Sequence, residues 1–217
     1  MIPVGPHAGQ QVLRAGASVE NASSAVIAVH GRGANAADII GLARAIDLPG
    51  VAWLAPDAAS HTWYPYSFLM PIEQNQPFLD SAISVVGGLL QHLEDNGIPA
   101  ENAVLLGFSQ GACLVSEFVA RYPRRYGGLA VFSGGLIGES VDPGKYAGSL
   151  AGTPIFGGCS DTDPHIPLER FEVTGQVLAQ LGGVVDFRVY PGMDHTINLD
   201  ELSAARALIA GVSRSVS

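Results

Sequence analysis

Along this chain, short apolar segments alternate with longer segments of helical periodicity. Most of the apolar segments are near-continuous and bounded by Gly or Pro, which is typical of parallel strands buried on both faces. Alternating strands and helices produce a mostly parallel sheet with helices packed on both of its faces. The predicted strands cover residues 24–30, 51–56, 103–108, 129–134, 154–158 and 185–190, and the predicted helices cover 77–97, 110–122, 167–183 and 199–212.

The whole chain is expected to form one domain. It has 217 residues, which suffices for a sizeable single core. No internal repeat, low-complexity tract or linker divides it, and the segment QQVLRAG near the start predicts an additional antiparallel edge strand. We therefore expect a single α/β domain over residues 1–217, with a central sheet of about seven strands. The predicted elements use nearly all residues, so no cap domain is expected.

The charge balance makes several classes of partner improbable. Acidic residues number 20 against 11 basic ones, a formal net charge of -9. Without a Lys/Arg cluster, neither nucleic acid nor an anionic membrane surface is an expected partner. The first residues do not predict a secretory signal, and no apolar run is long enough to span a membrane. Cys113 and Cys159 lack metal-ligand spacing and suit a reducing compartment, so a cytoplasmic protein is expected.

The segment GFSQG places Ser109 between Gly107 and Gly111, at the point where a predicted strand meets a predicted helix. A sharp strand-to-helix turn of this kind, the nucleophile elbow, presents a serine hydroxyl above the sheet. It needs small flanking residues because a side chain there would strike the neighbouring strand or helix. A serine that only caps the helix is the alternative, and we favour the nucleophile.

A serine nucleophile needs a base that is oriented by a carboxylate. On such folds the partners follow in the chain order Ser, Asp/Glu, His, each after a later strand. The loop after the strand at 154–158 offers Asp161 and Asp163, and the loop after the last strand offers His195. His195 is therefore the predicted base, with either aspartate as its partner.

The other histidines are assigned different roles. His7 and His92 are expected to be solvated, and His30 is expected to shape a glycine-rich loop by hydrogen bonding. His61 and His165 are candidates to border the site.

The segment HGRGAN after the first buried strand completes the predicted site. An oxyanion hole takes one N–H from the residue after the nucleophile, Gln110, and another from such a glycine-rich loop, here Arg32. For Gln110, the backbone N–H is expected to matter more than the side chain. For the Arg32 side chain, a surface ion pair is favoured over recognition of an anion at the mouth of the site.

With these residues assigned, the chain resembles the carboxylesterase/phospholipase family of α/β-hydrolases, which includes the acyl-protein thioesterases. The resemblance implies a Ser/Asp/His triad, no cofactor, and hydrolysis of carboxylic esters or thioesters, with lysophospholipids among the substrates of relatives. It assigns the carboxylate to Asp163 and leaves Asp161 a loop-shaping role. This chain departs from the residues usual in the family at three places. It has Arg32 and Ala34 in the glycine-rich loop, Ala112 after the elbow, and Cys159-Ser160 where a His-Gly pair is frequent. The resemblance rests on VHGRG, TWYPYSF, PIEQNQPFLDSAI, LLGFSQGA, VFSGG, DPHIP and YPGMDHTI.

Without a cap domain, the site is expected to be open and to accept small or medium acyl groups. The aromatic segment at 61–72 is the predicted wall. The partner is a small-molecule ester or thioester, and the sequence leaves a homodimer open. The predicted substrate-binding residues are Trp63, Tyr64, Tyr66, Phe68 and His165.

Two other functions stay open at this point. A metal-dependent hydrolase could use Asp161, Asp163 and His165 as ligands. A binding module without catalysis could keep the hydrolase fold, although it would have no reason to retain all three triad residues.

Overall fold

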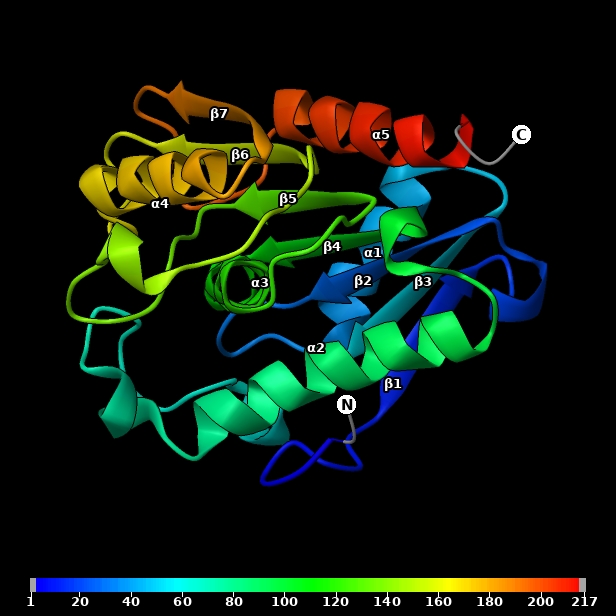
Figure 1. The fold of residues 1–217 in the computed structure, drawn as a ribbon, viewed down its shortest axis with the longest axis horizontal. Coiled ribbons are helices and arrows are strands. Elements are labelled where there is room, and N and C mark those ends of the chain that lie inside the picture. Colours follow the sequence, from blue (N-terminus) through cyan, green and yellow to red (C-terminus); the bar gives the residue numbers. More distant parts are fainter. Residues whose placement is uncertain (1–2, 215–217) are drawn as a thin grey trace.

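The computed structural model describes residues 3–214, and seven strands form one sheet through its centre (Figure 1). The strand order is β1-β3-β2-β4-β5-β6-β7. Only β1 runs antiparallel to its neighbour, β3, and all other pairs are parallel. This confirms the predicted α/β-hydrolase fold, including the antiparallel edge strand. The strands are β1 Val12–Gly16, β2 Ser24–Val29, β3 Val51–Pro56, β4 Ala103–Phe108, β5 Gly128–Phe132, β6 Pro154–Ser160 and β7 Val184–Tyr190.

Five helices cover the two faces of the sheet and bury two separate apolar cores. Helices α2 (Phe78–Asp95), α3 (Gln110–Arg121) and α4 (Leu168–Gln180) contribute to the larger core on one face. Helices α1 (Ala36–Ile46) and α5 (Leu199–Arg214) pack on the other face. In Figure 1, α2 and α3 lie in front of the sheet and α1 lies behind it.

Helix α1 was not among the predicted helices. It begins with a capping box, in which the Asn35 side chain accepts the N–H of Asp38 and the Asp38 carboxylate accepts the N–H of Asn35. Ile39 and Ile46 then face the core. The polar pair in front of an apolar pattern was the signal in the sequence for this helix.

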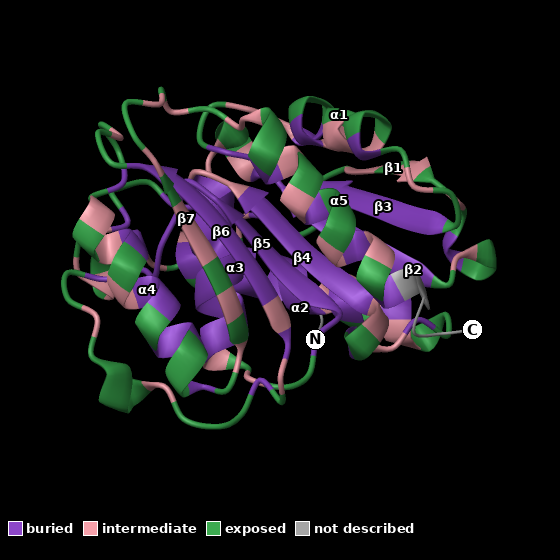
Figure 2. Ribbon diagram, turned by 90° about the horizontal axis from the view of Figure 1, so that it is seen from above, coloured by how far each residue is buried: buried purple, intermediate pink, exposed green. Residues whose placement is uncertain are grey.

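The inner strands explain why the apolar runs dominate the sequence. Every residue of β2, β3 and β5 is buried, whereas β7 at the edge alternates between exposed and half-buried residues (Figure 2). A strand covered on both faces needs apolar side chains throughout, and an edge strand does not. Within residues 3–214, no helix has the length and apolarity that a membrane crossing requires.

The longer connections follow the carboxyl ends of the strands, where the site residues lie. The segment between β5 and β6 contains one short 3₁₀ helix, Pro143–Lys145, and the described residues form no separate cap domain. The carboxyl ends of β4, β6 and β7 are therefore not covered by a separate domain of the described residues.

Candidate active site

Ser109 lies at the turn between β4 and α3, with φ 54° and ψ −119°. This strained backbone conformation is held because the Ser109 N–H donates to Phe132 O at 2.9 Å and the Cys113 N–H donates to Ser109 O at 3.0 Å. The turn presents the hydroxyl above the end of the sheet.

The two glycines of the turn are needed for close packing, as predicted. A Cβ on Gly111 would lie 2.1 Å from the carbonyl oxygen of Val29, in the neighbouring strand. A Cβ on Gly107 would lie 2.4 Å from the backbone of Gly111. Neither contact can be relieved by a rotating side chain, because both involve backbone atoms.

The imidazole of His195, in the loop between β7 and α5, lies between Ser109 and Asp163. Its Nε2 is 2.9 Å from Ser109 Oγ, and its Nδ1 is 2.7 Å from Asp163 Oδ2. A carboxylate can only accept, so Nδ1 carries the proton and Nε2 is free to accept from the serine hydroxyl. The ring also packs against Phe108, with 4.9 Å between ring centroids.

Asp163 is held in its ionised form by three donors. Its Oδ1 accepts the backbone N–H of His165 at 2.8 Å and of Ile166 at 3.0 Å. Burial alone raises the pKa of this carboxyl, but the hydrogen bonds from His195 and from the two backbone N–H groups outweigh burial and lower the pKa. The side chain is fully buried, whereas that of His195 is 17% exposed, so the imidazole remains reachable from the cavity.

Two unpaired backbone donors lie beside Ser109. In the part of the chain that the structure describes, neither the Arg32 N–H nor the Gln110 N–H donates a hydrogen bond. Gly31 brings the Arg32 loop against the nucleophile, since a Cβ on Gly31 would lie 3.3 Å from Ser109 Cβ. Free N–H groups at a helix start and in a glycine-rich loop suit a developing oxyanion.

A cavity of about 490 Å³ opens above these groups. Ser109, His195 and the two residues with free N–H groups lie in its lining, together with Phe108, Cys113 and Ile166. Four of the five predicted substrate-binding residues also line it: Tyr64, Tyr66, Phe68 and His165. The His165 ring meets the His195 ring edge to face, with 4.8 Å between centroids.

Sequence and structure comparisons agree on the family. A family model for phospholipases and carboxylesterases matches residues 15–213. This chain belongs to the phospholipase/carboxylesterase family. A crystal structure of a phospholipase/carboxylesterase from Dyadobacter fermentans is 42% identical, with a TM-score of 0.90 over 96% of this chain and 99% of that chain.

More distant relatives carry esterase and thioesterase names. A probable carboxylesterase of Oryza sativa subsp. japonica is 32% identical over 64% of this chain and 54% of its own length. Acyl-protein thioesterase 1 of Kluyveromyces lactis is 32% identical over 57% of this chain and 56% of its own length. The matches thus span about half the length of these two relatives.

Within this phospholipase/carboxylesterase fold, Trp63 does not line the cavity, contrary to the prediction. Its side chain is completely buried, and the indole N–H donates to His30 O at 2.9 Å. The side chain therefore joins the wall of the site to the loop after β2, and substrate cannot reach it.

The side chains of Arg32 and Gln110 also differ from expectation. Arg32 forms no ion pair within residues 3–214, and instead its guanidinium donates to three backbone carbonyls of the wall, at residues 64–66. The Gln110 side chain accepts the backbone N–H of Trp63 at 2.9 Å and donates to Tyr64 O at 2.8 Å. The side chain of Gln110 thus has a defined role besides its backbone N–H.

Two histidines outside the cavity lining hold the segments next to the same wall. His30 accepts the Ala58 N–H at Nε2 and donates to Gly31 O from Nδ1, which confirms the predicted loop-shaping role. The prediction for His7 was wrong, because this residue is buried and its ring bridges the Trp63 carbonyl and the Ala59 N–H. Burial lowers the pKa of His7, so the ring is held neutral.

Of the remaining histidines, His92 is half-buried on α2 and His61 is exposed. His61 bonds Ala34 O at 3.2 Å and lies outside the cavity lining.

Asp161 has the loop-shaping role that was predicted for it. Its carboxylate accepts the Gly192 N–H at 2.8 Å, whereas Asp163 faces His195. Asp161, Asp163 and His165 therefore do not converge, and the described residues contain no cluster of three acidic, His or Cys side chains fit to hold a metal ion.

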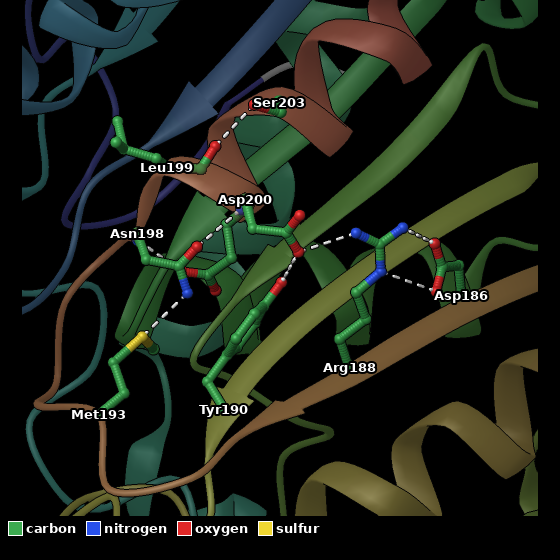
Figure 3. A network of polar contacts seen from close by, with 9 residues as sticks. Asp186, Arg188, Tyr190, Met193, Asn198, Leu199, Asp200 and Ser203 are labelled. Atoms are coloured by element: carbon green, nitrogen blue, oxygen red, sulfur yellow. Dashed lines mark hydrogen bonds and ion pairs between the residues drawn. The ribbon is translucent and has the colours of Figure 1, made fainter.

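A polar network fixes both ends of the loop that carries His195 (Figure 3). Before the loop, Arg188 and Tyr190 of β7 bond the Asp200 carboxylate at 2.8 and 2.7 Å. After it, the Asn198 side chain accepts the Glu201 N–H at 2.9 Å and contacts Met193 Sδ at 3.0 Å. The imidazole thus projects from a loop whose two ends are tied to each other.

Proposed function

We propose that this protein hydrolyses carboxylic esters, thioesters included, by transferring the acyl group to Ser109. The observation that carries the proposal is the continuous chain of hydrogen bonds from Ser109 Oγ through His195 to Asp163. The phospholipase/carboxylesterase family supports the same chemistry.

In the first half of the reaction, Ser109 Oγ attacks the carbonyl carbon while His195 Nε2 takes the hydroxyl proton. The negative charge that develops on the carbonyl oxygen is stabilised by the N–H groups of Arg32 and Gln110. The imidazolium then gives its proton to the leaving alcohol or thiol, and the acyl group stays on the serine.

In the second half, His195 takes a proton from water, and the resulting hydroxide attacks the acyl-enzyme. Asp163 keeps the imidazole in the tautomer that both halves require. The imidazolium returns its proton to Ser109, so the carboxylic acid leaves and the enzyme is regenerated.

The cavity supports small to medium acyl groups as substrates. About 490 Å³ is at the lower end of the range for sites that bind small molecules. One wall is aromatic and apolar, formed by Tyr64, Phe68 and Phe108. We infer that an alkyl chain of a few carbons lies against this wall and the leaving group faces the open side.

The test is hydrolysis of p-nitrophenyl esters of increasing chain length by wild type and Ser109→Ala. We expect the variant to lose at least about 10⁴-fold in kcat and the wild type to give a burst of p-nitrophenol equal to its active sites. The same acyl groups on a small thiol would then measure the preference between oxygen and sulfur esters. Equal rates for the two proteins would refute the assignment of the nucleophile.

A further inference from the structure

The side chain of Arg32 joins two loops of the site that are far apart in sequence. We call residues 30–35 the oxyanion loop and residues 62–68 the wall loop. Arg32 Nη1 donates to Pro65 O at 2.9 Å, and Nη2 donates to Tyr64 O at 3.0 Å and Tyr66 O at 2.6 Å. Three consecutive carbonyls thus converge on one guanidinium, which sits 5.9 Å from the centre of the Tyr64 ring.

Among the described residues, the other hydrogen bonds that join the oxyanion loop or Gln110 to the wall loop reach only its first half, residues 62–64. His30 O accepts the indole N–H of Trp63, and the Gln110 side chain binds the backbone of Trp63 and Tyr64. In the second half, Pro65 has no N–H to donate, and the Tyr66 N–H donates away from the oxyanion loop, to Asn75 Oδ1 at 2.9 Å. Among the described residues, Arg32 is the only donor to the carbonyls of Pro65 and Tyr66.

The second half of the wall loop borders the cavity directly. Pro65, Tyr66 and Ser67 all line it, and Tyr66 is 56% exposed. Residues 65–67 are all exposed, so packing alone does not fix them and their position depends on hydrogen bonds. Asn75 holds one side of this segment, since it accepts the Tyr66 N–H and donates to Ser67 O at 3.0 Å. Arg32 supplies the hydrogen bonds on the side of the oxyanion loop, and its own backbone N–H faces the reacting carbonyl oxygen in the proposed mechanism.

We propose that the Arg32 side chain is a positioning residue that holds residues 64–66 at a fixed distance from the oxyanion N–H of residue 32, and thereby sets the preference for acyl groups long enough to reach this wall. The proposal rests on the acyl transfer proposed above. An acetyl group is too short to use the wall, whereas a hexanoyl group lies along it.

The planar guanidinium of arginine suits this task better than the ammonium group of lysine. The guanidinium has five N–H donors in one plane and can serve carbonyls in different directions. A lysine ammonium at the same site would reach one or two of the three carbonyls, and a methionine would reach none. The number of hydrogen bonds from residue 32 to the three carbonyls therefore falls in the order Arg, Lys, Met, while the length of the side chain stays similar.

The experiment measures kcat and KM of wild type, Arg32→Lys and Arg32→Met with p-nitrophenyl acetate and p-nitrophenyl hexanoate. For Arg32→Met we expect the ratio of kcat/KM for hexanoate to that for acetate to fall about tenfold, mainly through KM for hexanoate. Arg32→Lys should give an intermediate ratio. Arg125→Met is the matched control, because Arg125 also donates to a backbone carbonyl, Ala151 O at 3.0 Å, and lies outside the cavity lining.

Several outcomes would overturn the proposal. An unchanged hexanoate-to-acetate ratio in Arg32→Met would show that the contact does not set chain-length preference. If Arg32→Met is poorly folded by circular dichroism, the same ratio in Arg32→Lys decides. The competing role for Arg32 is recognition of an anion, since among the described residues it is the only permanently charged one in the cavity lining.

A pair of isosteric substrates separates anion recognition from positioning. The mono-p-nitrophenyl ester of succinate carries a carboxylate, and the 4-methylpentanoate ester has the same shape without charge. A loss confined to the succinate ester would assign anion binding and refute positioning. Ser109→Ala is run in parallel, because full activity of that variant would refute the acyl transfer itself rather than the role of Arg32.

Discussion

The carboxylate of Asp161 accepts the backbone N–H of Gly192 at 2.8 Å, and so ties the loop after β6 to the loop that carries His195. Asp163, two residues later, bonds the imidazole in the same loop. One aspartate therefore holds the backbone of the loop, and the other holds the ring.

This division of roles predicts different effects for the two aspartates. Asp163→Asn should lower kcat by about 10⁴-fold, because an amide N–H facing Nδ1 favours the wrong imidazole tautomer. Asp161→Asn should change kcat by less than about threefold, because the asparagine oxygen still accepts the Gly192 N–H. Steady-state kinetics with active-site titration compares the two. A similar loss in both would contradict the separate roles.

Gly111 and Gly41 predict opposite effects of the same substitution. Gly111→Ala should lower the free energy of unfolding by at least about 3 kcal/mol, because its Cβ would meet backbone atoms of β2. Gly41 lies in α1 without a positive φ, and a Cβ added there would meet nothing within 4 Å. Gly41→Ala should therefore raise stability by about 0.5–1 kcal/mol. Urea unfolding measures both. Destabilisation by Gly41→Ala would argue against the helical assignment of α1.

The side chain of Gln110 should matter for stability while its N–H serves the reaction. Gln110→Ala keeps the backbone N–H of residue 110 but leaves the buried backbone N–H of Trp63 without its acceptor, which should lower the free energy of unfolding by about 1–3 kcal/mol. In folded protein we expect kcat for p-nitrophenyl acetate to stay within about tenfold of wild type. A loss as large as that of Ser109→Ala would show that the amide itself takes part in the chemistry.

Glu201 predicts a pH-dependent effect on stability. It is fully buried, one of its carboxyl oxygens has no partner among the described residues, and burial raises its pKa from 4.5 to about 7. The folded state favours the protonated carboxyl. The contribution of Glu201 to the free energy of unfolding is therefore complete below about pH 4.5 and is lost as the pH rises to about 7.

Replacing Glu201 by glutamine tests the direction of this pH dependence. Glu201→Gln cannot ionise and its oxygen can still accept the Asn198 N–H, so its stability relative to wild type should rise between pH 5 and 8 by up to about 3 kcal/mol. Thermal or urea unfolding at several pH values gives the difference. A constant difference across this range would mean that Glu201 does not titrate there.

The succession of strands along the chain and the position of the elbow could be predicted because both depend on local patterns. Apolar runs bounded by Gly and Pro mark β2 to β6, and the glycines around Ser109 mark the sharp turn. Asp163 could be preferred over Asp161 only through the family resemblance, since both follow the same strand. Nothing in their spacing shows which one turns toward His195.

The side-chain roles in the wall could not be predicted, because each depends on partners distant in sequence. His7 reaches Trp63 across 56 positions, and Arg32 reaches Tyr66 across 34. A histidine near a terminus suggests solvent, and an arginine in a loop suggests an ion pair, unless the opposing backbone is known. Helix α1 is different, since its capping residues Asn35 and Asp38 are a local signal that the sequence itself carries.

The hydrogen bond between Ser109 and His195 connects residues 86 positions apart and spans four parallel strands, from β4 to the exposed edge strand β7. Heat inactivation should therefore begin with fraying of that edge, while the interior of the sheet is still intact. Catalysis would then report the integrity of an edge strand, and inactivation would precede the loss of helical signal.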